Sequence, residues 1–312
     1  MKKFIILLST ILLYVSLCFS QVAMNTDGSS ANSSAMLDVN STNKGMLIPR
    51  MTQAQMEGIS SPATGLSVYN TDVNAVCYFN GSDWDCMDAQ SLFNKTFLCG
   101  DPLRDFRDGQ TYNTIQIGNQ CWMAQNLNVG IMINGNNNQT DNDTIEKYCY
   151  NNDTANCDTY GGLYQWDEMM QYVTTEGAQG ICPNGWHLPT DSEWMTLEES
   201  LGMCSGTASG CSGETGWRGT DEGSKLAGNE PLWANGNLDQ NANFGMSSFE
   251  ALPGGYRNTS GSFNNLFGGA YFRTSNENIL NTWTRYLSFS HAQVFRTYNN
   301  KAHGYSVRCI KD

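Results

Sequence analysis

The stretch Gly185-Trp186-His187-Leu188-Pro189-Thr190-Asp191-Ser192-Glu193-Trp194 joins the end of a strand to the start of a helix. Pro189 stops the strand, because proline has no backbone N–H to donate to a sheet. Thr190 and Glu193 have the spacing of a capping box, in which each side chain accepts a hydrogen bond from an unpaired backbone N–H of the other residue. The predicted helix has one apolar stripe and ends at a glycine; these residues are Trp194, Leu197, Leu201 and Gly202.

Residues 1–20 carry the pattern of a secretory signal peptide. Two lysines form its positive start, an almost wholly apolar run follows over 4–19, and a small residue precedes the cleavage point. The run is too short and too early for a stable membrane span. The rival interpretation is a lipoprotein signal with Cys18 lipidated, which Leu17 disfavours because a small residue should precede that cysteine. We therefore expect a protein that is secreted or held at a bacterial cell surface.

Cysteine usage agrees with export. Ten cysteines remain after Cys18 leaves with the signal, and an even count in a secreted chain favours disulfides. Spacing suggests four bridges that close short or medium loops and one that ties the middle of the chain to its last strand; the pairs are Cys77–Cys86, Cys99–Cys121, Cys149–Cys157, Cys204–Cys211 and Cys182–Cys309. A zinc site is disfavoured, since there is no CxxC pair and only three histidines occur.

The composition and net charge of the chain limit the kinds of molecule that it is expected to bind. The formal net charge is −13, and the mature chain, without the two signal-peptide lysines, is near −15. Because an acidic surface repels phosphate backbones, we expect no nucleic-acid partner. Charged residues are only 15% of the chain and aromatic residues 11%, a mixture typical of extracellular, turn-rich domains with enough apolar surface for a core. After the signal, no apolar run is long enough for a transmembrane segment.

The chain is expected to divide near residue 90. Residues 21–88 hold short strand-like segments, a brief helical run and a hairpin around Asn80-Gly81. The segments LDVNSTNKGMLIPRMT (37–52) and GLSVYNTDVNAVCYFNGSDW (65–84) resemble the N-terminal stalk of many secreted Bacteroidetes-type proteins, which is itself similar to phage tail-fibre segments. A region this small would be marginally stable alone. We weigh a spacer, which we favour, against a stalk through which copies form a homo-oligomer.

Residues 95–312 are predicted to form the main domain. A turn, a strand, a second turn and another strand occupy 108–123. A helix is predicted to begin within 161–170 and to present an apolar face of Trp166, Met169, Met170 and Val173. After the capped helix the sequence becomes β-rich, with candidate strands at 249–257, 270–275, 283–290 and 303–310.

Five motifs of this domain occur in the order of one family. They are DGQTYNTIQIGNQCWMAQNLNV (108–129), YGGLYQWDEMM (160–170), GICPNGWHLPTDSEWMTL (180–197), ALPGGYRN (251–258) and GYSVRCIKD (304–312). Together they resemble the Fibrobacter succinogenes major paralogous domain, a secreted or surface domain similar in its second half to formylglycine-generating enzymes and C-type lectins. The resemblance implies a loop-rich, disulfide-bonded α+β fold that is C-type-lectin-like, with two helices and a twisted antiparallel sheet, after a small β-rich N-terminal stalk.

Catalysis is not favoured by the residues. Formylglycine-type oxidation needs reactive thiols near the end of the domain, where only Cys309 occurs. His187, His291 and His303 have no recognisable nucleophile partner, and no nucleophile-elbow motif is present. The acidic pairs Asp167-Glu168 and Asp191/Glu193 could suggest glycoside hydrolysis, but both fall in first turns of predicted helices, where acids complement the helix dipole. We therefore assign no catalytic residue, and an enzyme is the less favoured class.

Sugar binding through calcium is also not favoured. Asn229-Glu230-Pro231-Leu232-Trp233 is close to a lectin triplet, yet Leu232 stands where an amide ligand should be. No cofactor is expected, and a structural calcium site is left open at Asp141-Asn142-Asp143, a segment more typical of a solvated loop.

Aromatic side chains in the loop-rich half are the candidate ligand-binding residues, because they can stack on sugar faces; they are Trp217, Trp233, Tyr256, Tyr271 and Trp283. We expect a non-enzymatic recognition or adhesion protein whose partner is an extracellular glycan or protein. The alternatives are an extracellular enzyme that acts on polysaccharide and a structural component of the surface or matrix.

Overall fold

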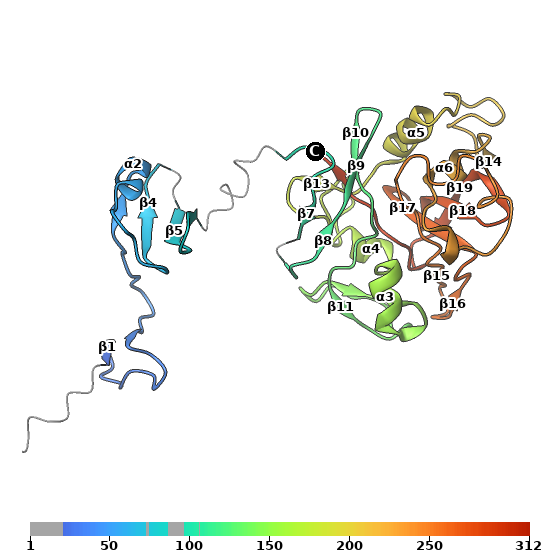
Figure 1. Ribbon diagram of the computed structural model, residues 1–312. Coiled ribbons are helices and arrows are strands. Elements are labelled where there is room, and N and C mark those ends of the chain that lie inside the picture. The colour runs from blue at the N-terminus through green and yellow to red at the C-terminus, as the bar shows by residue number, and fades with distance from the viewer. Residues whose placement is uncertain (1–20, 73–74, 87–96, 106) are drawn as a thin grey trace, which may run out of the picture. The chain divides into compact units, whose positions relative to one another are not determined.

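The computed structural model describes residues 21–72, 75–86, 97–105 and 107–312; the expected signal peptide lies outside them. The chain forms two compact units, Met1–Thr96 and Phe97–Asp312, which Figure 1 draws in blue to cyan and in green to red. Within the described residues, none of the helices has the length and apolar character needed to cross a membrane.

The first unit is built on a small sheet. Its strands are β1 (Val22–Met24), β2 (Leu37–Val39), β3 (Arg50–Met51), β4 (Ser67–Asn70), β5 (Ala75–Phe79) and β6 (Trp84–Cys86). β1 and β2 pair with each other, and the other four form a sheet in the order β3-β4-β5-β6. The predicted hairpin is confirmed, since β5 and β6 pair antiparallel around Asn80-Gly81. Helix α2 (Gln53–Glu57) has a capping box from Thr52 and buries Met56 against Val68 and Cys77.

The second unit is a mixed α+β fold of many short elements (Figure 1). Its strands are β7 (Leu103–Arg104), β8 (Thr111–Tyr112), β9 (Thr114–Ile117), β10 (Gln120–Met123), β11 (Ile131–Met132), β12 (Glu146–Lys147), β13 (Trp186–His187), β14 (Gly216–Arg218), β15 (Tyr256–Arg257), β16 (Phe263–Asn264), β17 (Gly269–Asn278), β18 (Asn281–Ser288), β19 (His291–Asn300) and β20 (Ile310–Lys311). Its helices are α3 (Thr154–Tyr160), α4 (Trp166–Met169), α5 (Asp191–Ser200) and α6 (Glu222–Leu226), with 3-10 turns η1 (Tyr150–Asn152) and η2 (Glu230–Leu232).

Two four-stranded antiparallel sheets organise this unit. One has the order β13-β20-β10-β9 and pairs the last strand of the chain with the strand that carries Trp186. The other has the order β14-β19-β18-β17 and contains the three longest strands. Helix α5 packs on one face of this second sheet. A cluster of buried aromatic rings, Trp122, Trp194, Phe249 and Phe272, fills the space between the two sheets and the helix, with centroids 5.1–5.9 Å apart.

The capped helix is confirmed as predicted. Thr190 accepts from the backbone N–H of Glu193, and the Glu193 carboxylate accepts from the backbone N–H of Thr190. Trp194 and Leu197 are buried, and Gly202 follows the helix with φ near +116°, a conformation that glycine adopts without strain.

Four expectations differ from the structure. Helix α4 is a single turn, because Gln171 and Tyr172 adopt positive φ, and Val173 is exposed rather than on an apolar face. Only the end of the candidate strand 249–257 is a strand, and 303–310 pairs through isolated bridges before β20. In place of two helices, the described part of the second unit has four, of which only α5 exceeds two turns.

The structure contains five disulfides that join the same cysteines as the spacing suggests: Cys77–Cys86, Cys99–Cys121, Cys149–Cys157, Cys204–Cys211 and Cys182–Cys309. Cys182–Cys309 spans 127 positions and ties the loop before β13 to the residue before β20. Because it closes the longest loop, it restricts the unfolded chain most.

A buried network of ion pairs joins α5 to the second sheet. Glu198 binds Arg218 of β14 through both carboxylate oxygens, at 2.8 Å each, and also lies 2.8 Å from Nε of Arg285 on β18. Asp191 lies 2.6 Å from Nη1 of Arg285 and 2.6 Å from Nη2 of Arg296 on β19. The network fixes the helix against three of the four strands, because each charge is desolvated and needs its partner.

Loss of the long bridge should destabilise the protein. We expect a Cys182→Ala/Cys309→Ala variant to lose about 2–5 kcal/mol of unfolding free energy, and a Cys204→Ala/Cys211→Ala variant to lose less because its loop is short. Urea denaturation of both variants measures this. Free thiols at Cys182 or Cys309 in the mature protein, detected by non-reducing mass spectrometry, would show that the bridge does not form.

Neutralising the buried carboxylate of Glu198 should strongly destabilise the fold. We expect Glu198→Gln to lower the unfolding free energy by about 3–5 kcal/mol, because Arg218 would keep its buried charge without a carboxylate partner and Arg285 would keep only Asp191. Exposed Glu230→Gln is the matched control and should change it by less than about 0.5 kcal/mol. Equal effects of the two substitutions in urea denaturation would show that the network does not stabilise the fold.

Candidate functional site

The candidate site is a row of aromatic side chains across the sheet β14-β19-β18-β17, on the face opposite α5. Trp217 pairs in register with Phe295, Phe295 with Tyr286, and Tyr286 with Tyr271. Successive residues of a strand point to opposite faces, so one register position on four adjacent strands places four rings side by side. We call these four residues the aromatic ladder.

The rings of the ladder are in contact. Ring centroids are 4.9 Å apart for Trp217 and Phe295, 6.3 Å for Phe295 and Tyr286, and 4.4 Å for Tyr286 and Tyr271, whose planes are nearly parallel. All four side chains are half-buried, so each keeps part of its surface open to solvent. Cross-strand aromatic pairs stabilise a sheet, and a half-exposed row of them also offers a continuous apolar surface.

Further rings extend the ladder at both ends. His291 stacks on Trp217 with centroids 3.8 Å apart and planes 8° from parallel. At the other end, Tyr305 stacks on Tyr271 at 5.4 Å and Tyr256 lies 4.7 Å from it. His303 completes this end, 5.8 Å from Tyr256 and 5.6 Å from Tyr305.

The backbone around Tyr271 is shaped to admit the stacked rings. A Cβ on Gly269 would lie 2.5 Å from the ring of Tyr286 and 3.0 Å from that of Tyr271, so this position requires glycine. Asn265, in a left-handed conformation with φ of 63°, donates from its amide to both tyrosine hydroxyls, at 2.8 Å and 3.4 Å. The two phenols are therefore held in one orientation, stacked on each other.

A buried charge, Arg273, lies beside the ladder, two residues after Tyr271 on the same strand. Arg273 donates to Thr282 Oγ1 and to the carbonyls of Asn300 and His303, and its guanidinium lies 4.6 Å from the ring centroid of Tyr305. Burial lowers the pKa of Arg273 to about 10, and burial together with this charge lowers the pKa of His303 below its ordinary value. Burial raises the pKa of Tyr271 well above the value of a free phenol, so its hydroxyl stays protonated.

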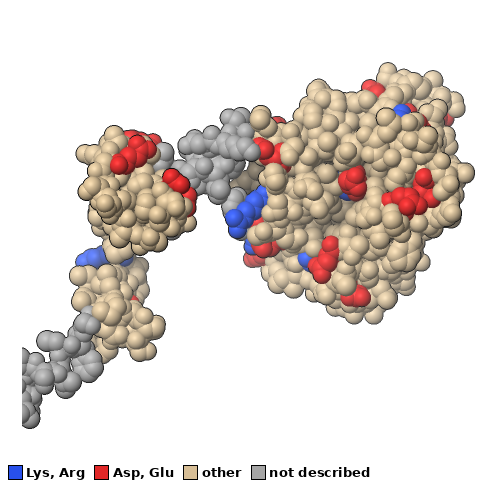
Figure 2. Space-filling model, in the orientation of Figure 1, with Lys and Arg blue, Asp and Glu red and all other residues tan. Residues whose placement is uncertain are grey.

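This arrangement suits a neutral ligand with flat apolar faces. Stacking covers the ring faces of Tyr271 and one face of Trp217, so the ladder offers apolar ring edges and the faces left unstacked. The polar groups beside the rings are an amide and two imidazoles that exchange hydrogen bonds without a fixed negative charge. Acidic and basic groups are scattered on the face of the second unit seen in Figure 2, separated by uncharged side chains.

The structure brings three of the five candidate ligand-binding residues together. Trp217 and Tyr271 belong to the ladder and Tyr256 to its extension. Trp233 lies in the core, 6% exposed, with its indole N–H donating to the carbonyl of Gly228 at 3.1 Å. Trp283 lies on the other face of the sheet, between Tyr298 and the guanidinium of Arg296.

Sequence reasoning missed the central rings, Tyr286 and Phe295. Phe295 lies on β19, a strand that was not among the candidates although its buried and half-buried positions alternate at Val294, Phe295 and Arg296. The alternation is not evident from the sequence, because Arg296 occupies one of the buried positions. An arginine is normally expected at the surface, and only its ion pair with Asp191 explains its burial. One sequence pattern could have indicated the site. An aromatic residue stands directly before or after an arginine in each of three strands, at Trp217-Arg218, Arg285-Tyr286 and Phe295-Arg296.

The histidine of the strand–helix junction has a structural environment. His187 Nε2 lies 2.9 Å from Glu193 and Nδ1 lies 2.7 Å from Asp312, so one imidazole joins the helix cap to the end of the chain. The hydrogen bond to Glu193, helped by Asp312, raises the pKa of His187 above its ordinary value although burial acts in the opposite sense.

The calcium loop remains an expectation. Asp141 and Asp143 are exposed, and the side-chain amide of Asn142 donates to Thr140 and Glu146 within the loop. In the part of the chain that the structure describes, no group of three or more His, Cys, Asp or Glu side chains is placed to hold a metal ion.

Two family profiles match the chain. Residues 115–311 match the Fibrobacter succinogenes major domain, the family that the five motifs indicate. Residues 24–97 match a family described as a phage tail like trimerisation region. No curated protein and no solved structure gives a match.

We expect Thr190→Ala to damage folding more than His187→Ala damages binding. Loss of the N-cap should lower the unfolding free energy by about 0.5–2 kcal/mol at every pH. The pKa of His187 is raised in the folded state, so its contribution is present below the ordinary histidine pKa and lost as pH rises through the folded value. Urea denaturation at pH 5.5 and pH 9 should therefore show a larger loss for His187→Ala at the lower pH. If His187→Ala folds normally and abolishes ligand binding, the functional site lies at β13 instead of the ladder.

Proposed function

The chain belongs to the Fibrobacter succinogenes major domain family, and we propose that it is an exported, non-enzymatic recognition or adhesion protein that binds extracellular carbohydrate through the aromatic ladder. The observation that carries this proposal is the register of Trp217, Phe295 and Tyr286 with Tyr271, four half-buried rings on adjacent strands. Such a surface fits the face of a sugar ring, where the C–H groups lie, while the hydroxyl groups at the rim reach neighbouring polar side chains.

The size of the ladder favours a short oligosaccharide over a single sugar. The outer strands β14 and β17 lie roughly 14 Å apart, because neighbouring strands in a sheet are about 4.8 Å apart. The half-buried imidazoles of His291 and His303 and the amide of Asn265 flank this length, and each can exchange hydrogen bonds with hydroxyl groups.

Several features support a binding role over an enzymatic one. All ten cysteines of the mature chain are paired, so none of them is a free thiol for formylglycine-type oxidation. Glu193 is engaged in the helix cap, and Asp191 in the buried ion network. Disulfides and the predicted signal peptide support export.

A C-type-lectin-like scaffold is part of the proposal. It is supported by the mixed α+β fold, by the capped helix α5 packed on an antiparallel sheet, and by the pairing of the final strand β20 with β10 near the start of the domain.

We also propose that the first unit assembles three copies of the chain. The support is the match of residues 24–97 to a trimerisation region of phage tail like proteins. Three linked ladders would bind a repetitive glycan surface more tightly than one, because the second and third contacts become intramolecular.

The ladder is tested by glycan arrays with the mature protein, followed by calorimetry with the best soluble ligand. We expect Tyr286→Ala to weaken binding about tenfold or more, since a central aromatic contact typically carries more than about 1 kcal/mol. Tyr286→Phe keeps the ring and should bind nearly as the wild type does.

Tyr298→Ala is the matched control, because it removes an exposed tyrosine from the opposite face of the same sheet. Equal losses for Tyr286→Ala and Tyr298→Ala, or no ligand across broad arrays, would count against the ladder. Turnover of a polysaccharide that is lost on changing one carboxylate, with folding intact, would instead support the enzymatic alternative.

A further inference from the structure

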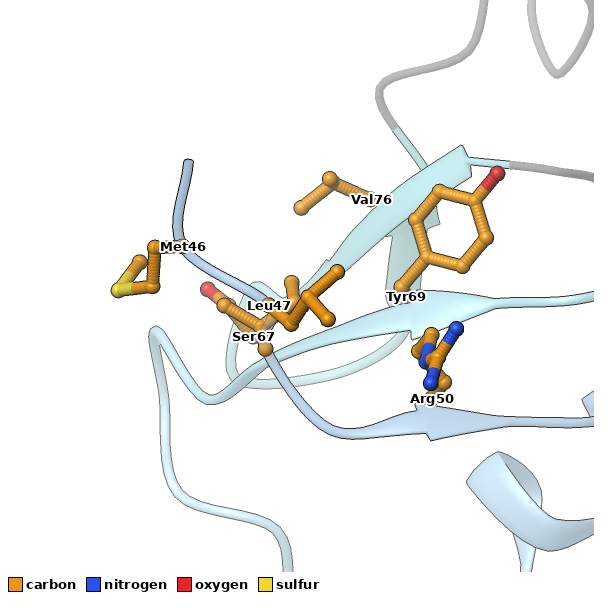
Figure 3. Close-up of a pocket in the computed structure, with 7 residues that line it drawn as sticks. Met46, Leu47, Arg50, Ser67, Tyr69 and Val76 are labelled. Atoms are coloured by element: carbon orange, nitrogen blue, oxygen red, sulfur yellow. The ribbon is translucent and has the colours of Figure 1, made fainter. Parts of the chain in front are cut away.

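The outer face of the small sheet in the first unit is apolar and hollowed. Alternation along β4 and β5 turns Val68 and Cys77 inward and Tyr69 and Val76 outward. Tyr69, Val76 and the segment Met46–Ile48 then line a hollow of about 620 Å³, with Arg50 and Ser67 at its edge. Figure 3 shows the side chains of Met46 and Leu47 on the segment that leads into β3, beside the sheet that carries Tyr69 and Val76.

This face is unusual for a sheet whose other side is already packed. Met56, Val68 and Cys77 form the core of the unit on the inner face. The strands β4, β5 and β6 pair antiparallel, and such strands with one buried face normally carry polar residues on the other. Here Leu47 is 79% exposed and Met46 is 62% exposed, next to the half-buried ring of Tyr69. Contiguous exposed apolar groups of this kind mark an interaction surface.

We propose that a second copy of this chain covers the hollow, so that Met46 and Leu47 of one copy pack against Tyr69 and Val76 of the next in a closed ring of three. The inference rests on the proposed trimer and identifies the surface that forms it. The hollow lies within the residues that match a trimerisation region, which favours another copy of the chain as its occupant.

The geometry of the face agrees with a ring. The hollow has two unlike sides in each copy, the segment with exposed Met46 and Leu47 and the sheet face with Tyr69 and Val76, and in the proposed contact one side of a copy meets the other side of the next. A contact between two different surfaces is heterologous, and it buries every copy of both surfaces only when the ring closes. Arg50 is exposed and is the only charged residue among those that line the hollow, so apolar packing can proceed while this cation stays in water at the rim.

The test is the mass of the mature full-length protein in solution, measured by sedimentation velocity over a hundredfold range of concentration. The interface variant is Met46→Lys/Leu47→Lys, which adds two cations beside Arg50. Both side chains are exposed in the single chain, so the variant should keep its fold, which the melting curve and the Cys77–Cys86 bridge report. The matched control is Ile279→Lys/Leu280→Lys, two adjacent residues that are 82% and 67% exposed in the β17–β18 turn.

We expect the wild type and the control to sediment as trimers and the interface variant as a monomer. A trimer that survives the interface substitutions would overturn the surface while leaving the assembly in place. A wild type that is monomeric throughout would overturn both, and a dimer broken by the same substitutions would overturn the ring of three. Calorimetry tests glycan binding separately from assembly, because the monomeric variant should keep the wild-type affinity per site for a soluble oligosaccharide. Its apparent affinity for a glycan-coated surface should fall at least tenfold, since the linked contacts are lost.

Discussion

The buried ion network between α5 and the long-stranded sheet is the constraint on which the second unit depends. Glu198 and Asp191, seven positions apart on one helix face, meet Arg218, Arg285 and Arg296 from three strands. Although burial acts to raise the pKa of Asp191, the guanidinium groups of Arg296 and Arg285 outweigh it and hold that pKa below its ordinary value. Desolvated charges of this kind tolerate few alternative partners, so they fix the register and orientation of the elements that carry them.

The ion network and the aromatic ladder lie on opposite faces of the same sheet. Arg218, Arg285 and Arg296 each lie next in sequence to a ladder ring, Trp217, Tyr286 and Phe295 respectively. The alternation of a strand sends the guanidinium inward and the ring outward. Anchoring the inner face through directional ion pairs therefore sets the positions of the outer rings, and this rigidity is what a preorganised binding surface needs.

The two units differ in core size and in exposed apolar side chains, and these differences match the two proposed roles, recognition and assembly. The second unit has a core of tilted and edge-to-face aromatic rings and four of the disulfides, and its ladder is built of uncharged rings. The first unit has a small core and leaves large apolar side chains exposed, which is the character of a segment completed by association. Recognition by the one and assembly by the other would make a multivalent surface protein.

The sequence by itself determined the features that depend on neighbours along the chain. The capping box of α5, the hairpin at Asn80-Gly81 and the hairpin over β9 and β10 follow from local turn and cap chemistry, and family motifs placed the main domain. Only the tertiary structure decided that Asp191 is a buried partner of two arginines and not just a helix-end acid, that β19 is a central strand, and that Trp233 is core while Tyr286 is surface. The reason is physical: whether a charge or a ring is buried depends on partners some hundred positions away, and neither its own residue type nor its neighbours in sequence contain that information.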